Sequence, residues 1–404
     1  MLTFRLAAAI LAGTCILFGC STTPQREPTV TEGIEVDLQE PETFTSGSVR
    51  LRSARFSDLP GTTETDWERS LNAFRVSCTS MGTQPLWQRA CANAQETPTG
   101  LARTFFEDNF DLWQVFSLES PDGAETDAGL MTGYFEPILR ASRKRHGIYQ
   151  YPIYGVPDDL ITVDLAAIHP QLKGMRLRGK LIGNKLVPYD DRAGIAARKD
   201  LEQKHVICWA DDPVEVFFLQ IQGSGRVLLD DGKLIRVGYA NQNGHPYRSL
   251  GAWLIENAGL TRDEMSMQRI KQWVRDNPER RQELLNANPN FVFFAEREGY
   301  SADQGPIGAQ GLPLMPMASV AVDRRYWKLG VPFVTEIEQS NPPMAFARPV
   351  IAQDTGGAIR GVIRFDYFWG LGNEAGAMAG GQKSRARAWV MVPKGESPAS
   401  VLVR

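Results

Sequence analysis

Apolar positions in the first part of the chain recur at the spacing of helices. In the earliest such segment they fall every three or four residues, on one helical face. Thr65 and Glu68 have the spacing of a capping box, so this helix is expected to begin there. A second helix is expected to start near Pro85, and a third to cover residues 101–106. The apolar residues that define the first helix are Leu71, Phe74 and Cys78.

The pattern changes near residue 130, where short apolar runs alternate with turns rich in glycine, proline and aspartate. Such runs predict strands. Helical spacing returns after residue 246, and strand-like runs resume at residues 291–294 and 311–392. This order predicts a mixed, mainly β fold with two β units and no regular alternation of strand and helix. The expected strands include Met131–Leu139, Leu181–Val187 and Val214–Gln222. The expected helices are Tyr247–Ala258, Thr261–Arg275 with Thr261 and Glu264 as a capping box, and one from Asn277 to before Pro289.

The N-terminus has the pattern of an export signal. Arg5 precedes an apolar run that ends at Gly19 and is too short to span a bilayer as a mature helix. Residues 1–19 therefore read as a signal peptide. The run ends in Leu-Phe-Gly-Cys, which resembles a bacterial lipobox and makes Cys20 the expected lipidation site. The alternative is an ordinary signal peptide with a chance cysteine. Ser21, in place of aspartate, favours anchoring at the outer membrane, facing the periplasm.

Residues 20–60 are rich in threonine, proline, glutamate and serine and poor in large apolar side chains. They are expected to be a lipidated, flexible tether. Export also places the chain in an oxidising compartment. Cys78 and Cys91 lie in consecutive predicted helices. They either form a disulfide or remain two buried thiols, and the sequence leaves both open.

Composition and motif content narrow the class of function. A net charge of −3, with 43% hydrophobic and 23% charged residues, is typical of a soluble globular protein and excludes a basic nucleic-acid binder. The cysteines lack zinc-site spacing, and no nucleotide-binding loop or serine-hydrolase motif occurs. We therefore expect no metal and no other cofactor. The histidines are scattered at His146, His169, His205 and His245.

Polar chemistry is concentrated in the last third of the chain. Asp323, Asp354 and Asp366 each follow or end an apolar, strand-like run. Eight glycines lie between Thr355 and Gln382. This density lets loops adopt positive φ angles and lets the backbone approach a ligand closely. These features predict a ligand-binding or catalytic region here.

The three aspartates, with Thr-Gly-Tyr at 132–134, Gln-Gly-Ser-Gly at 222–225 and the segment 239–249, resemble the MltA family of lytic transglycosylases, which carry a 3D domain. The resemblance runs from about residue 70 to 393. It implies a double-psi β-barrel with N-terminal and connecting helices, and a smaller inserted β-barrel-like domain. A groove between the two would hold the glycan. The implied bounds are 61–136 and 212–404 for the main domain, about 311–393 for the 3D region and 137–211 for the insert.

The resemblance also implies an activity on peptidoglycan, with cleavage between N-acetylmuramic acid and N-acetylglucosamine and formation of 1,6-anhydro ends. Asp366 would be the single acid/base, its pKa raised by flanking aromatic residues. Asp323, beside two arginines, would be structural. One carboxyl group suffices when the substrate supplies its own nucleophile, whereas most glycosidases need two. The implied substrate-binding residues are Thr132, Gly133, Tyr134, Gln222, Gly223, Ser224, Gly225 and Asp354.

Two other functions remain open at this stage. The first is a hydrolase of the same glycan that uses water and a second carboxylate, Asp323 or Asp354. The second is a non-catalytic peptidoglycan-binding lipoprotein. Without the resemblance, Gln222 and Ser224 would read as a polar turn and Tyr134 as a core aromatic residue. The expected partners are glycan strands, the membrane through Cys20 and complexes of cell-wall synthesis or hydrolysis, but not nucleic acid.

Overall fold

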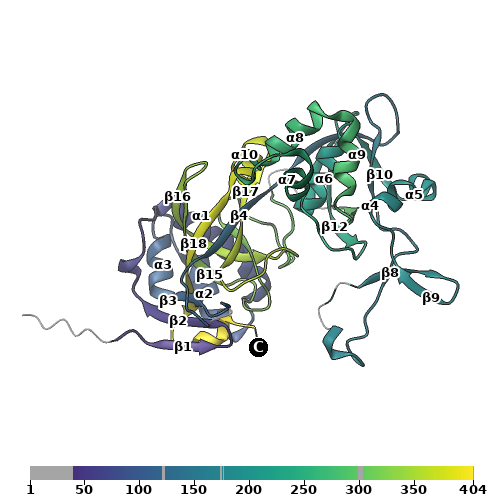
Figure 1. The fold of residues 1–404 in the computed structure, drawn as a ribbon. Helices are drawn as coiled ribbons and strands as arrows, with labels where there is room; N and C mark the ends of the chain where they lie inside the picture. Colours follow the sequence, from purple (N-terminus) through teal and green to yellow (C-terminus); the bar gives the residue numbers. More distant parts are fainter. Residues whose placement is uncertain (1–39, 121–122, 173–174, 176, 299–303, 404) are drawn as a thin grey trace, which may run out of the picture. The chain divides into compact units, whose positions relative to one another are not determined.

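Strands from both ends of the chain form the larger of the two main sheets (Figure 1). The computed structural model describes residues 40–403 apart from 121–122, 173–174, 176 and 299–303, and the elements below belong to this part. The predicted signal peptide and Cys20 lie outside the described residues. In sheet order the strands are β1 (Thr43–Ser46), β2 (Val49–Ala54), β3 (Phe110–Ser117), β18 (Lys383–Pro393), β15 (Pro332–Gln339), β16 (Met344–Asp354), β14 (Ser319–Val322), β17 (Arg364–Leu371) and β4 (Gly129–Glu136).

This sheet closes on itself. Because β18 pairs with β4 as well as with β15, the strands β18, β15, β16, β14, β17 and β4 form a ring in the described part of the chain. The pairs β14–β16 and β17–β4 are parallel, and the other pairs of the ring are antiparallel. The parallel pairing of β17 with β4 brings residues 129–136 beside residues 364–371.

Residues 43–54 differ from the expectation of a flexible tether over 20–60. β1 and β2 continue the sheet outward from β3, and the side chains of Val49 and Leu51 are only 2% and 0% exposed. The apolar residues of β2 are few, but they alternate with arginines, which is the pattern of a strand buried on one face. Composition alone hid this alternation. The folded body therefore starts well before residue 61.

Three helices pack against the ring, as the sequence predicts. They are α1 (Glu64–Met81), α2 (Pro85–Glu96) and α3 (Ala102–Asn109). Their fully buried Trp67, Phe74 and Phe106 share one apolar core with side chains of the ring. α2 starts at Pro85 as expected. α1 starts earlier than the Thr65 cap predicts, because the Thr63 side chain accepts the hydrogen bond from the Asp66 amide instead.

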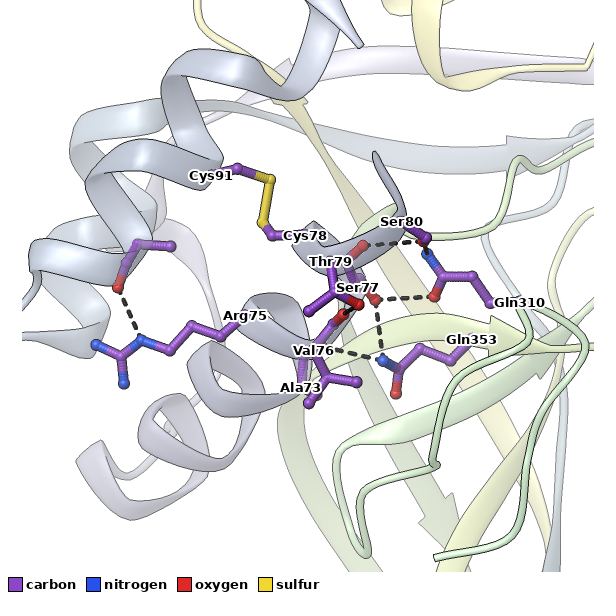
Figure 2. Close-up of a disulfide and its surroundings, with 11 residues drawn as sticks. Ala73, Arg75, Val76, Ser77, Cys78, Thr79, Ser80, Cys91, Gln310 and Gln353 are labelled. Atoms are coloured by element: carbon purple, nitrogen blue, oxygen red, sulfur yellow. Dashed lines mark hydrogen bonds between the residues drawn. A yellow bond between two sulfur atoms is a disulfide. The ribbon is translucent and has the colours of Figure 1, made fainter. Parts of the chain in front are cut away.

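Cys78 of α1 and Cys91 of α2 form a disulfide, with their Cα atoms 5.4 Å apart (Figure 2). This answers the question that the sequence left open. Beside the disulfide, Gln353 of β16 donates hydrogen bonds to the Ala73 carbonyl oxygen at 3.0 Å and to Ser77 Oγ at 2.9 Å (Figure 2). The cross-linked helices are thus attached to the end of β16, directly before Asp354.

The second main sheet is built from residues 138–296. The predicted insert, 137–211, contains only three of its strands, because β5 pairs in parallel with β11, which follows residue 211. In sheet order the strands are β13 (Val292–Glu296), β12 (Leu234–Gln242), β11 (Ser224–Leu229), β5 (Ile138–Ser142), β10 (Val206–Ala210) and β6 (Tyr151–Tyr154). A small sheet holds β7 (Ile161–Thr162), β8 (Arg178–Ile182) and β9 (Lys185–Pro188), the last two forming a hairpin in place of the single strand expected at 181–187.

The prediction of a strand at Val214–Gln222 is wrong, because this segment is helix α6 (Pro213–Gln222). The Asp212 side chain caps its first turn by accepting from the Val214 amide, and Pro213 occupies the first helical position. Gly223, with φ of 78°, ends it in the left-handed conformation. Because α6 is buried on most sides, its continuous apolar run has the composition of a buried strand.

The expected helices after residue 246 are present but shorter. The capping box of Thr261 and Glu264 starts a single 3-10 turn, and a new α-helix follows it. α6 shares an apolar cluster with α7 (Leu250–Ala258), α8 (Met267–Asp276) and α9 (Arg281–Asn286). The other helices are α4 (Arg192–Ala196), α5 (Lys199–Lys204) and α10 (Gly372–Gly381), with 3-10 turns at Phe56–Asp58, Pro170–Leu172, Arg262–Glu264, Pro278–Arg280 and Pro398–Val401.

The prediction of a mixed, mainly β fold is confirmed, since strands outnumber helices in the part described and form its three sheets. None of the helices in this described part of the chain is both long enough and apolar enough to cross a membrane.

Candidate active site

Thr132 and Asp366 lie opposite each other on neighbouring strands of the ring. The parallel register of β4 and β17 pairs these two residues, which are 234 positions apart in the chain. Thr132 Oγ1 donates a hydrogen bond of 2.6 Å to Asp366 Oδ1. Both residues are partly buried. Among the described residues, Asp366 Oδ2 has no hydrogen-bond partner. One oxygen of the carboxyl group is therefore fixed by Thr132, and the other is not engaged by any protein group in the described part of the chain.

Arg364 is a part of this site that the sequence analysis missed. It precedes Asp366 by two positions on β17, so both side chains point to the same face of the sheet. Its Nη2 donates to Thr132 Oγ1 at 3.0 Å, and its Nη1 donates to the carbonyl oxygen of Phe365. The spacing of two within a predicted strand was a usable signal for its position, but not for the contact with Thr132.

Tyr134 and Asp354 form a second contact near the first. Tyr134 Oη donates to Asp354 Oδ2 at 3.0 Å, and the Ala309 amide donates to Asp354 Oδ1 at 2.9 Å. The Tyr134 ring also lies 5.2 Å from the ring of Phe368, tilted by 46°. Burial raises the pKa of Asp354, although these donors favour its ionised form. The strand register brings the two contacts together, because Ala321 of β14 pairs with Asp354 on one side and with Asp366 on the other.

Burial raises the pKa of Asp366 to about 6. The hydrogen bond from Thr132 and the charge of Arg364 oppose this rise, and the negative charge of Asp354 adds to it. The aromatic residues that flank Asp366 in the sequence account for only part of this rise in pKa. Strand alternation puts Phe368 on the same face as Asp366 but Phe365 and Tyr367 on the opposite face. A pKa near 6 leaves a sizeable protonated fraction in mildly acidic solution. This carboxyl group can therefore serve as a general acid.

Gly133 is required by packing. A Cβ atom there would lie 2.6 Å from Gln382 Oε1 and 2.7 Å from Trp369 Nε1, two atoms that are joined by a hydrogen bond of 2.7 Å. Any larger residue would separate them. This close approach explains the glycine between Thr132 and Tyr134 without a ligand.

The Gln-Gly-Ser-Gly segment lies where α6 meets β11. Gln222 Oε1 accepts a hydrogen bond of 3.0 Å from the Phe135 amide, which places it beside the Tyr134 end of β4. Gly223 ends α6, and Ser224 pairs with Gly238 at the start of β11. A Cβ atom on Gly225 would collide with Leu219 Cδ1 at 2.4 Å. Of this segment, only Gln222 has a hydrogen bond to β4 among the described residues.

Asp323 stands apart from these contacts. Its fully buried carboxylate accepts from the Gly361 amide at 2.8 Å and forms ion pairs with Arg325 and Arg360. Burial alone would raise the pKa of Asp323, but the hydrogen bonds from Arg325 and Gly361 outweigh it and leave the pKa lowered. Asp323 therefore joins the end of β14 to the loop before β17.

A metal centre has no support in the part of the chain that the structure describes, where no three histidine, cysteine or acidic side chains gather closely enough to hold an ion.

Comparison with known proteins assigns the family. The model of the MltA specific insert domain matches residues 130–295, and the model of the 3D domain matches residues 318–392. Membrane-bound lytic murein transglycosylase A of Escherichia coli (strain K12) is 32% identical over 301 residues, which cover 72% of each chain. The chain belongs to the membrane-bound lytic murein transglycosylase A family. This confirms the resemblance seen in the sequence, and it makes the protein a member of an enzyme family.

Solved structures of the MltA family share the fold. The crystal structure of MltA from Neisseria gonorrhoeae is 35% identical, covers 89% of this chain and 96% of its own, and superposes with a TM-score of 0.73. MltA from E. coli with bound chitohexaose is 28% identical, covers 87% of this chain and 96% of its own, and has a TM-score of 0.65. The strands of the second main sheet, from Ile138 to Glu296, fall inside the matched range of the insert model, 130–295, except for the last residue.

The Asp323→Asn variant of this MltA-family protein is expected to be less stable than wild type while retaining measurable turnover. An amide keeps the size of the side chain but loses the charge that Arg325 and Gly361 contact, so the free energy of unfolding should fall by about 1–3 kcal/mol at neutral pH. Urea denaturation measures the loss. Because the pKa of Asp323 is lowered, the difference from wild type should shrink as pH falls through that pKa. Unchanged stability with abolished turnover would move Asp323 into the catalytic machinery.

Proposed function

We propose that the protein is a lytic transglycosylase that cleaves the β-1,4 bond between N-acetylmuramic acid and N-acetylglucosamine in peptidoglycan and leaves 1,6-anhydromuramoyl ends. The observation that carries this proposal is the state of Asp366. Its pKa is about 6, Oδ1 is held by Thr132, and Oδ2 has no partner in the described part of the protein. Names of family members support the substrate class.

Asp366 would act first as the acid. Its neutral carboxyl group gives a proton to the glycosidic oxygen, the bond from that oxygen to C1 of the muramoyl residue breaks, and the 4-hydroxyl of the departing sugar is formed. The carboxylate then takes the proton of the muramoyl 6-hydroxyl while that oxygen attacks C1. The proton returns to Asp366, and no water is consumed. Intramolecular attack has a high effective concentration, which lets it outcompete water.

The other two aspartates support a mechanism with one carboxyl group. Asp354 accepts hydrogen bonds from Tyr134 and from the Ala309 amide, and Asp323 is ion-paired and buried away from these contacts. A base or nucleophile in a hydrolase needs a free oxygen toward the substrate. The contacts of Asp354 and Asp323 therefore favour a positioning role for the former and a structural role for the latter.

The proposal extends to the setting of the site. The six-stranded ring, made of β4 and five strands of the 3D region, would be the double-psi β-barrel, and the second sheet, with strands through Glu296, would be the barrel-like insert. Glycan strands would bind in a groove between them, with Gln222, Ser224 and Tyr134 contacting the sugars. Lipidation at Cys20 would anchor the protein to the outer membrane, facing the periplasm, where it would meet complexes of cell-wall synthesis or hydrolysis. The word "membrane-bound" in the names of relatives supports an anchor.

Product analysis tests the reaction. Purified sacculi are digested in water labelled with heavy oxygen, and the released muropeptides are analysed by mass spectrometry beside a muramidase control. We expect unlabelled anhydro ends, with a rate that falls as pH rises above about 6, because Asp366 then loses the proton it must donate. Labelled reducing ends would establish a hydrolase. Absence of any released product, with sacculi still bound, would establish a binding protein.

A further inference from the structure

Arg364, Thr132 and Asp366 form a continuous line of hydrogen bonds. Arg364 Nη2 donates to Thr132 Oγ1 at 3.0 Å, and Thr132 Oγ1 donates to Asp366 Oδ1 at 2.6 Å. Thr132 of β4 bridges Arg364 and Asp366, which lie on the same face of the neighbouring strand β17. All three side chains are only partly exposed, so water competes weakly for these contacts.

The direction of these bonds follows from the chemistry of the groups. A guanidinium group is a donor only and stays charged, so the Thr132 oxygen must act as acceptor toward Arg364. Thr132 has a single hydrogen, and the charged donor on its oxygen turns that hydrogen toward Asp366 and strengthens it as a donor. Oδ1 therefore remains the carbonyl-type acceptor when Asp366 is neutral. The acidic proton then belongs on Oδ2, the oxygen without a partner in the described structure.

We propose that Arg364 is a positioning residue that acts through the Thr132 hydroxyl to keep the acidic proton of Asp366 on Oδ2. This inference rests on the proposed function, since it assigns a task only if Asp366 is the acid. It also gives Thr132 a role different from the sugar contact that the sequence suggested. A proton on Oδ1 would face Thr132 and would be out of position for the glycosidic oxygen.

The second donor of Arg364 explains why arginine suits this position. Nη1 donates to the carbonyl oxygen of Phe365, the residue between Arg364 and Asp366 on the strand. This bond and the bond to Thr132 hold the planar guanidinium group at two points. Lysine has the charge but not this fork, so it cannot hold both contacts in the same geometry. The charge of Arg364 also favours the carboxylate form of Asp366, so its loss should raise the pKa of that group.

A double-mutant cycle separates the positioning role from a merely structural one. Arg364→Lys and Thr132→Val should each lower kcat by about 10-fold to 100-fold, which corresponds to one hydrogen bond to a charged group. Combined, they should lower kcat by no more than the larger single effect, because Arg364 acts through Thr132. Thr132→Ser, which keeps the hydroxyl, should restore most of the rate. Arg364→Met should in addition move the alkaline limb of the kcat profile to higher pH.

Three controls make the outcome decisive. Arg385→Lys, an exposed arginine on β18, should leave kcat unchanged. Thermal melts exclude unfolding, and binding of chitohexaose as a probe should be unaffected in every variant. Additive effects of Arg364→Lys and Thr132→Val, or full activity of either one, would overturn the inference. Wild-type activity of Asp366→Asn in the same assay would instead overturn the assignment of Asp366 as the acid in the proposed function, so the two failures are distinguishable.

Discussion

Asp366→Asn is expected to lower the rate of glycan cleavage by at least about 10²–10⁴-fold, the contribution of general acid/base catalysis. The amide has the size of the carboxyl group and can still accept the hydrogen bond from Thr132. It cannot, however, transfer a proton to the glycosidic oxygen. Release of anhydromuropeptides from sacculi, followed over time by chromatography, measures the loss. Binding of the variant to sacculi should persist.

The same variant should remain folded. Because burial raises the pKa of Asp366, the charged form destabilises the native state above about pH 6. At about pH 8, Asp366→Asn should therefore be at least as stable as wild type, and any gain should vanish as pH falls toward the ordinary carboxyl pKa. Asp127→Asn changes a partly exposed aspartate whose ion pairs with Arg385 and Arg387 are 3.7 and 3.9 Å long; it serves as the matched control and should be fully active. Near-normal turnover of Asp366→Asn beside an inactive, folded Asp354→Asn would reassign the acid.

Replacing both Cys78 and Cys91 by serine should lower the free energy of unfolding by about 3 kcal/mol, the value for a loop of this length. The two residues are 13 positions apart, and the cross-link restricts the unfolded chain. Chemical denaturation of wild type and variant, each with and without a reductant, measures the difference. The reductant should lower the stability of wild type only.

Loss of the disulfide should also affect the candidate active site. α1 holds Gln353 through Ala73 and Ser77, and Gln353 precedes Asp354 on β16 (Figure 2). Activity of the double variant should therefore decline at lower temperature than in wild type. Equal stability of wild type and variant under oxidising conditions would show that the disulfide contributes nothing to the folded state.

Local patterns in the sequence predict an element correctly where its structure depends mainly on its own residues. The helix at Pro85 and the general order of helices and strands follow from spacing and caps. Segment 213–222 was misread, because an apolar run buried on most sides has no period to distinguish helix from strand. β1 and β2 were missed because their few apolar residues are hidden in a polar composition.

The candidate site depends on pairing between distant segments, which one sequence does not reveal without a known relative. The resemblance named Thr132 and Asp366, but the hydrogen bond between them requires the parallel register of β4 and β17. The role of Arg364 was invisible for the same reason, since its partner lies on the other strand. The glycine at 133 is explained by contacts with Gln382 and Trp369, which also come from far along the chain.

Closure of the ring sets the order in which this enzyme can become active. β4 is synthesised early, but both of its partners in the ring, β17 and β18, come near the end of the chain. The long loop between them must close before these contacts form, and such non-local pairing is slow. The second sheet, whose strands all lie between these partners in sequence, can form first. Thr132 can therefore contact Asp366 only after β17 has been synthesised and has paired with β4, and a chain that ends before β17 lacks this contact.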